Sequence, residues 1–262
     1  MQRLVLIALL ALAVQGVRNA GAQTENALQS PRGLPSHYGE IADATRWPSS
    51  AVGVVTVTLN LSHRRFCTGT LVAPKIVLTA AHCLFADDQL LKPDSVQFLA
   101  GVNRGVPAAS SRAERLIVAK DFTSAGPWTP QRSAADWGII VLNDAVSIRP
   151  IPVKPMTSGQ IRQHAGPDSF LQIGYGMDRP YLPSIVRNCQ VEAGSDEKVF
   201  IFHCLTNSGY SGSPFLAEVD GVLSLVGIAS SASKKERFGI ACSATQFAGP
   251  IAELMQALEV KQ

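Results

Sequence analysis

A glycine-rich loop in the last third of the chain holds the residue best suited to nucleophilic chemistry, Ser211, in the string NSGYSGSP at 207–214. A tight loop of this kind exposes a hydroxyl while the backbone N–H groups of Gly209 and Ser211 converge on one point. Paired N–H donors of this type stabilise the oxyanion of a tetrahedral acyl intermediate. Glycine-serine loops are also common turns, so the string predicts acyl transfer only in company with a base.

A serine hydroxyl becomes a nucleophile when a base lies within hydrogen-bond reach, and the pKa of histidine suits that role near neutral pH. His82 is the candidate, in LTAAHC at 78–83. Asp136 begins DWGIIVL at 136–142, directly before an apolar run typical of a buried strand. A carboxylate there can accept from the second ring nitrogen of His82 and fix its tautomer. Asp121 competes for this role, but no such strand follows it.

The elements that must position these residues are mostly short strands. Apolar and polar residues alternate over 55–62, which predicts a half-buried strand. About a dozen such short runs, separated by Gly, Pro, Ser and Asp, favour an all-β barrel or sandwich. A helix is predicted over Pro250–Val260, with proline in its first turn. The proline-rich run at 149–155 predicts an extended connector between two halves.

Composition excludes several classes of protein. The chain is 46% hydrophobic and 16% charged with a net charge of +3, and it has no basic stripe with interleaved aromatics. Nucleic acid is therefore not an expected partner.

The first 22 residues resemble a secretory signal, with Arg3, an apolar run at 4–14 and Ala20-Gly21-Ala22. That run is shorter than the roughly 20 residues that span a bilayer. We expect a secreted monomer, extracellular or periplasmic, that has no membrane association once the signal is removed.

With TAAHC, DWGIIVL and GYSGSP in the order His, Asp, Ser, the chain resembles the chymotrypsin-fold serine proteases, and among them the bacterial V8 or glutamyl-endopeptidase branch. The resemblance runs from about residue 41 to the C-terminus. It implies an all-β fold of two six-stranded antiparallel barrels with a C-terminal α-helix. It also implies that Ser211 is the nucleophile, His82 the general base and then acid, and Asp136 the orienting carboxylate. The N–H groups of Gly209 and Ser211 would form the oxyanion hole. The reaction would hydrolyse peptide bonds in proteins or peptides without a cofactor or a metal.

This resemblance divides the chain into a signal at 1–22, a segment at 23–40 and a protease domain at 41–262. Within the domain we expect one barrel at about 45–148, a second at about 156–248 and the helix at 250–260. Residues 23–40 are either a removable propeptide or an N-terminal extension, because Ile41 stands where the mature family N-terminus lies. Tyr210 stands where trypsin-like zymogens have the aspartate that pairs with the new N-terminus. The V8 branch also lacks an aspartate at this position.

The resemblance places the primary substrate pocket at Leu205, Thr206, Ala229, Ser230 and Gly239. Leu205 replaces the aspartate of trypsin-like enzymes, so a basic P1 residue, the one whose carbonyl is attacked, is not expected. Ala229 replaces the histidine of glutamyl endopeptidases, which weakens an acidic preference. The small apolar lining predicts a small or apolar P1 residue. An acidic preference stays open through the charged loop at 234–237, for which a solvated loop is the simpler interpretation. The backbone at Ser230 is expected to pair with an extended substrate.

The five cysteines are expected to form two disulfides, Cys67–Cys83 beside His82 and Cys189–Cys204, which leaves Cys242 as a buried free thiol. A different class of function remains as an alternative, namely an inactive protease homologue that acts as a secreted binding protein. The α/β-hydrolase elbow G-x-S-x-G is excluded, because Ser213 stands where its second glycine belongs and the histidine precedes the serine.

Overall fold

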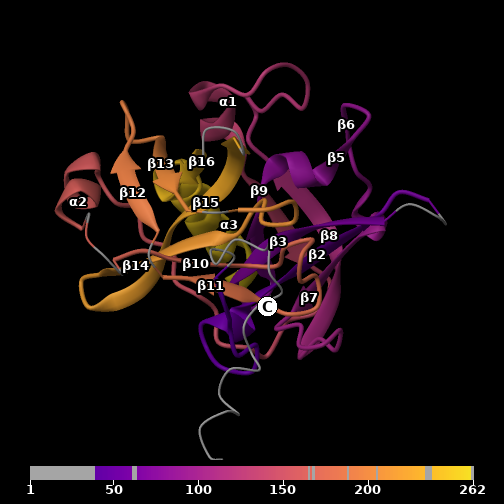
Figure 1. Ribbon diagram of the computed structural model, residues 1–262. Helices are drawn as coiled ribbons and strands as arrows, with labels where there is room; N and C mark the ends of the chain where they lie inside the picture. Colours follow the sequence, from indigo (N-terminus) through magenta and orange to yellow (C-terminus); the bar gives the residue numbers. More distant parts are fainter. Residues whose placement is uncertain are drawn as a thin grey trace, which may run out of the picture. The chain divides into compact units, whose positions relative to one another are not determined.

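The computed structural model describes residues 39–60, 64–164, 166, 169–187, 189–204, 206–233 and 238–260. The predicted signal, nearly all of the segment at 23–40, Leu205 and the loop at 234–237 lie outside the described residues. Antiparallel strands dominate the part that is described (Figure 1). In that part, no helix combines the length and the apolar character needed to cross a bilayer.

The first half of the protein is a closed antiparallel barrel. Its strands follow the order β2-β3-β4-β9-β8-β7, and β7 pairs with β2 to close the ring. Val55 and Val57 point into the barrel and are buried, while Thr56 between them is half-buried on the outer face. The bounds are β2 (Val52–Thr58), β3 (Arg64–Ala73), β4 (Ile76–Thr79), β7 (Val96–Ala100), β8 (Ala109–Val118) and β9 (Gly138–Leu142), with a small hairpin of β5 (Phe85–Ala86) and β6 (Gln89–Leu90).

The second half is a curled sheet of eight strands in the order β1-β11-β10-β14-β15-β16-β13-β12. A second closed barrel of six strands was expected, and the sheet differs in being open. The reason lies at β11, whose two edges are already paired with β10 and with β1, so neither edge is free for β12. The bounds are β1 (Glu40–Ile41), β10 (Leu171–Gly174), β11 (Ser184–Val186), β12 (Gln190–Ala193), β13 (Val199–His203), β14 (Pro214–Val219), β15 (Val222–Ser233) and β16 (Phe238–Ser243).

The predicted C-terminal helix is confirmed as α3 (Ala248–Glu259), with Pro250 in its first turn and Ile251 and Leu254 on its buried face. Two short helices were not predicted, α1 (Pro130–Ala135) and α2 (Ser158–Gln163). Each begins after a threonine whose hydroxyl accepts from the backbone N–H three residues on, which is a readable N-cap signal. Short 3-10 turns complete the fold: η1 (Ser49–Ala51), η2 (Ala81–Leu84), η3 (Pro93–Ser95) and η4 (Ala244–Gln246).

Two clusters of buried apolar side chains stabilise the closed barrel and the curled sheet. One fills the closed barrel and continues to Tyr175 and Ile228 of the second half. The other lies within the curled sheet, where Phe215 packs against the rings of Phe200 and Phe202. Burying side chains of this size contributes about 1.5–3 kcal/mol each. The loops that carry the candidate site residues are therefore attached to two well-packed supports.

Candidate active site

Asp136 and His82 form a directly hydrogen-bonded pair. The ring Nδ1 of His82 lies 2.8 Å from Asp136 Oδ2, and the backbone N–H of His82 donates to Asp136 Oδ1 at 2.9 Å. The carboxylate is fully buried, whereas 24% of the His82 side chain is exposed. Because Nδ1 faces the carboxylate, Nε2 is the ring nitrogen left to take a proton from a neighbouring group.

Asp136 is held at the junction of a helix and a strand. It follows the last residue of α1, and its N–H donates to Ser133 O before β9 enters the barrel. The hydroxyl of Ser230 donates to Asp136 Oδ2 at 2.7 Å. Three donors thus compensate for burying this carboxylate. The sequence analysis assigned Ser230 to the pocket wall and its backbone to substrate pairing, so the bond from its hydroxyl to Asp136 is an addition. Asp121, the competing carboxylate, is exposed.

His82 lies on η2, which a disulfide between Cys67 and Cys83 ties to β3. The indole of Trp128 lies edge-on to the imidazole, with ring centroids 5.3 Å apart and planes at 82°. The guanidinium of Arg132 stacks 4.1 Å from the Trp128 ring and also donates to the carbonyls of Ser124 and Gly126. Arg132 therefore fixes the loop that forms an aromatic wall beside His82. The sequence motifs around His82, Asp136 and Ser211 did not predict a role for Trp128 or Arg132.

The Ser211 loop depends on two glycines with left-handed backbone angles, Gly209 at φ +99° and Gly212 at φ +79°. A β-carbon on Gly209 would lie 2.6 Å from the carbonyl oxygen of Tyr175, and one on Gly212 would lie 2.4 Å from that of Thr68. Only glycine fits both the angle and the space. The flanking residues tie the loop to β15, because Gly212 N donates to Ala229 O at 2.8 Å.

Thr68 connects the two halves of the protein beneath this loop. Its hydroxyl donates to Gly209 O at 2.9 Å and accepts from Tyr175 N at 3.0 Å. Its backbone N–H donates to Ser211 O at 2.9 Å, and its carbonyl accepts from the hydroxyl of Thr79 at 2.8 Å. This fully buried threonine therefore fixes the backbone on both sides of Tyr210. Sequence reasoning did not find it, since its partners are far away along the chain.

The backbone N–H groups of Gly209 and Ser211 have no acceptor among the described residues. Such groups are available to a developing oxyanion. Within the same described part, no hydrogen bond joins Ser211 Oγ to His82. Gly212 nevertheless packs against the backbone nitrogen of Ala80, two residues before His82, and this contact brings the serine loop alongside the histidine turn.

Tyr210, the residue before the candidate nucleophile, fills the space behind the loop. Its ring packs on the α-carbons of Gly174 and Gly176, and burial raises the pKa of its phenol. Ile41 lies elsewhere, 59% exposed in β1, where it pairs with Ser184 of β11. A buried aromatic ring thus stands where a zymogen-type enzyme would place a charged pair.

A cavity of about 170 Å³ adjoins Ser211. Of the predicted pocket residues, Thr206, Ala229 and Ser230 line it, and Leu205 lies outside the described residues. Gly239 is not in the lining, because the ring of Phe202 packs against its α-carbon and lines the cavity in its place. Phe202 therefore supplies an aromatic ring to a cavity whose other lining side chains are mostly small or polar.

Three cysteines lie near the site, and two of them are close enough to His82 to resemble metal ligands. The Sγ atoms of Cys67 and Cys83 lie near a ring nitrogen of His82, but they are bonded to each other. Cys242 is a fully buried free thiol behind Asp136, and burial raises its pKa well above the ordinary value, with the Asp136 charge adding to the effect. A thiol in that state is unreactive.

The second disulfide, Cys189–Cys204, joins the residue before β12 to the residue after β13. Its second cysteine lies two residues before Thr206 of the cavity. Closing a loop of about fifteen residues stabilises a fold by about 3 kcal/mol in the chain-entropy model. The disulfide thus fixes the strand end from which the cavity wall begins.

A closed antiparallel barrel that carries His82 and Asp136, beside a curled sheet that carries Ser211, is the fold of the chymotrypsin-like serine hydrolases. Residues 48–251 match the model of the trypsin family, which is most of the chain. The protein therefore belongs to the trypsin family and is a serine endopeptidase.

Among solved structures, the VesB protease of Vibrio cholerae is similar, with a TM-score of 0.63 and 16% sequence identity over 83% of this chain and 67% of that one. At this identity the likeness concerns the fold alone. A search of curated protein sequences gave no significant match.

Proposed function

We propose that the protein is a secreted endopeptidase that cleaves peptide bonds through an acyl-enzyme on Ser211, with His82 as base and acid and Asp136 as orienting carboxylate. The observation that carries this proposal is the buried Asp136 carboxylate, which engages both the backbone and the Nδ1 of His82. This arrangement fixes the tautomer in which Nε2 accepts a proton.

In the proposed reaction, Ser211 Oγ attacks the substrate carbonyl while its proton passes to His82 Nε2. The N–H groups of Gly209 and Ser211 hold the oxyanion of the tetrahedral intermediate. His82 then gives its proton to the leaving amine, and the C–N bond breaks. A water molecule, deprotonated by the same Nε2, attacks the acyl-enzyme. The bond between the acyl carbon and Ser211 Oγ breaks, His82 returns the proton to Oγ, and the second product leaves as a carboxylic acid. Ser230 and Asp136 keep the imidazolium oriented through both halves of the cycle.

We propose a small or apolar P1 residue. The cavity beside Ser211 holds about 170 Å³, and no charged side chain is present among its described lining residues. Phe202 and Ala229 offer an apolar surface, whereas Thr206 and Ser208 offer hydroxyls. A buried charge would lack a partner there, which disfavours both acidic and basic P1 residues.

Secretion is supported by the apolar N-terminal run of the sequence and by two disulfides, which persist in oxidising compartments. The buried Tyr210 supports kinship with the V8 branch, because an activation ion pair with a new N-terminus has no place beside it. On that basis the serine loop is assembled without N-terminal insertion, and removal of residues 23–40 is not required for a formed oxyanion hole.

The test is to express the chain from Gln23 and incubate it with casein and a peptide library, alongside Ser211→Ala. We expect wild-type cleavage after small or apolar residues and none with the variant. Cleavage after Glu or Asp would overturn the P1 assignment while leaving the nucleophile in place. Inactivity of both the chain from Gln23 and one from Ile41 would favour the binding-protein alternative.

A further inference from the structure

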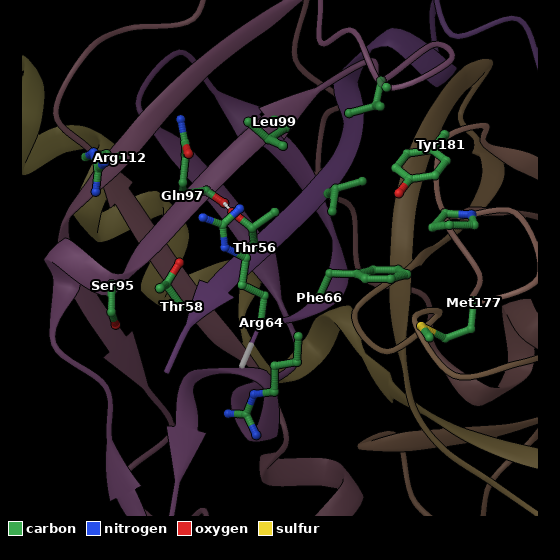
Figure 2. A pocket seen from close by; sticks show the side chains of 15 residues that line it. Thr56, Thr58, Arg64, Phe66, Ser95, Gln97, Leu99, Arg112, Met177 and Tyr181 are labelled. Atoms are coloured by element: carbon green, nitrogen blue, oxygen red, sulfur yellow. Dashed lines mark hydrogen bonds between the residues drawn. The ribbon is translucent and has the colours of Figure 1, made fainter. Parts of the chain in front are cut away.

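A groove of about 490 Å³ runs across the outer face of the closed barrel, away from the cavity beside Ser211. We call it the arginine groove. Figure 2 shows Met177 and Tyr181 along one side, Arg112 and Gln97 along the other, and Arg64 and Phe66 between them. The predicted catalytic residues do not line it, and the proposed function gives it no role.

The floor of the arginine groove is one row of side chains across four neighbouring strands. Phe66 of β3 pairs with Thr56 of β2, Thr56 pairs with Gln97 of β7, and Gln97 pairs with Arg112 of β8. Three strand spacings of about 4.8 Å separate the ends of the row by about 14 Å. An extended peptide of about four residues covers that distance. The groove therefore has the length of a peptide segment.

The groove is basic and lacks counter-charges. Arg64 and Arg112 are both exposed, and no acidic residue is present among the described residues that line it. The Arg112 guanidinium donates to the backbone carbonyl of Asp94, and in the described part neither Arg64 nor Arg112 pairs with a carboxylate. A guanidinium has five N–H donors, so Arg112 keeps donors for carboxylates of a bound chain, and the exposed Arg64 offers more.

The apolar side of the groove is unusually exposed for its residue types. Met177 is 60% and Tyr181 65% accessible, and both lie on the loop between β10 and β11. They lie across the groove from Arg112, with the ring of Phe66 beside them on the floor. A ligand that fits both sides carries acidic side chains next to apolar or backbone surface.

One end of the groove touches the Ser211 loop. The Phe66 ring lies 2.7 Å from where a β-carbon on Gly209 would be, and the backbone N–H of Met177 donates to Ser208 O at 2.8 Å. The cavity assigned to the P1 side chain is lined by Ser211 and by Ala229–Ala232 and shares no lining residue with the groove. The substrate chain after the scissile bond must therefore leave past Phe66 and Met177, into the arginine groove.

We propose that the arginine groove binds an acidic segment of the protein substrate on the leaving-group side of the scissile bond. This inference rests on the proposed function of Ser211. From the spacing of the row, Asp or Glu residues about three to six positions after the cleaved bond meet Arg64 and Arg112. The enzyme thus selects cleavage sites that are followed by acidic sequence, whatever residue occupies P1.

The test compares three quenched fluorescent peptides that share every residue up to the second position after the scissile bond. Their next four residues are all Glu, all Gln or all Lys. At low ionic strength we expect kcat/KM to be at least about fivefold higher for the Glu peptide than for the Gln peptide, and lowest for the Lys peptide. In 0.5 M NaCl the preference should shrink, because exposed charges are then screened.

Arg64→Gln combined with Arg112→Gln should abolish the preference for Glu. The matched control is Arg162→Gln with Lys198→Gln, which removes the same charge from exposed residues of α2 and of the turn before β13, and this control should keep it. Equal kcat/KM of the wild-type enzyme for the Glu and Gln peptides would overturn the proposal. So would a preference that survives in the Arg64/Arg112 variant.

A P1 aminocoumarin amide, which has no residue after the scissile bond, separates the two proposals. Equal cleavage by the wild type and the Arg64/Arg112 variant is expected. If this substrate and the peptides all resist cleavage, the proposed function fails. The groove proposal is then tested by measuring how tightly the peptides bind. Fluorescence anisotropy of the labelled Glu and Gln peptides should then give a Kd at least about fivefold lower for Glu, lost in the Arg64/Arg112 variant. Equal Kd values would overturn the proposal.

Discussion

Thr68→Val removes one buried hydroxyl and nearly preserves the shape of the side chain. The hydroxyl donates to Gly209 O at 2.9 Å and accepts from Tyr175 N at 3.0 Å, and the residue is completely buried. Valine would leave a carbonyl and an N–H without partners in a place that water does not reach. Such unpaired groups cost about 1–3 kcal/mol each. We expect the free energy of unfolding to fall by about 3 kcal/mol, allowing for partial relaxation.

The same change should also slow catalysis. Gly209 carries one of the two N–H groups assigned to the oxyanion, and Thr68 fixes its peptide backbone from below. Loss of a whole oxyanion donor costs about 10²–10³ in kcat, so a loosened donor should cost about tenfold. KM for a short amide substrate should change little, because the contact matters most when charge develops on the carbonyl oxygen.

Thr70 provides a matched control two residues along the same strand. It is equally buried, but its hydroxyl has no hydrogen-bond partner among the described residues. Thr70→Val should therefore leave stability unchanged or slightly raised. Urea unfolding with the disulfides intact and steady-state kinetics at 25 °C measure both effects. If the two valine variants were equally stable and equally active, the assignment of Thr68 as the support of the oxyanion loop would be wrong.

Other parts of the site give sharper or simpler outcomes. Asp136→Asn should lower kcat by about 10⁴-fold, because it favours the wrong tautomer of His82. Ser230→Ala leaves the carboxylate two of its donors and should lower kcat by about tenfold. Similar kcat values for the two variants would contradict the greater importance of Asp136. Because burial raises the pKa of Cys242, a thiol reagent should find no reactive group in the native protein and one after unfolding without reductant; rapid native labelling would refute this. Burial also raises the pKa of Tyr210 above that of an unfolded tyrosine, so the unfolded state releases its proton first and stability should fall as pH rises above about 10. The urea midpoint measured from pH 8 to 11 should drop less steeply in Tyr210→Phe, and parallel curves would count against the explanation.

The residues expected to react could be named from the sequence because each lies in a short motif with a local physical reason. Glycines around Ser211 permit the positive φ angles of its loop, and an apolar strand after Asp136 explains its burial. The residues that support them could not be found in this way. The hydroxyl of Ser230 meets a carboxylate 94 positions away, and Thr68 meets Gly209 across 141 positions. No local pattern encodes contacts of that separation.

For the fold, too, the general architecture could be predicted from the sequence and some of its details could not. Alternation of apolar residues and turn signals indicated an all-β protein with a C-terminal helix, and both are present. The open edge of the second sheet was not predictable, because it depends on β1, a strand of two residues without a periodic pattern. Phe202 was missed as a pocket residue for a related reason. Its place in the cavity follows from the lack of a side chain at Gly239 on the neighbouring strand.

The most direct test of the central claim is the site of covalent labelling by a fluorophosphonate. Such reagents react with a serine only when a neighbouring base and an oxyanion site activate its hydroxyl. Intact-mass and peptide mass spectrometry of the chain from Gln23 should show one adduct per molecule, on Ser211, and none in Ser211→Ala or His82→Ala. A folded wild-type protein that stays unlabelled, or an adduct on another serine, would contradict the account.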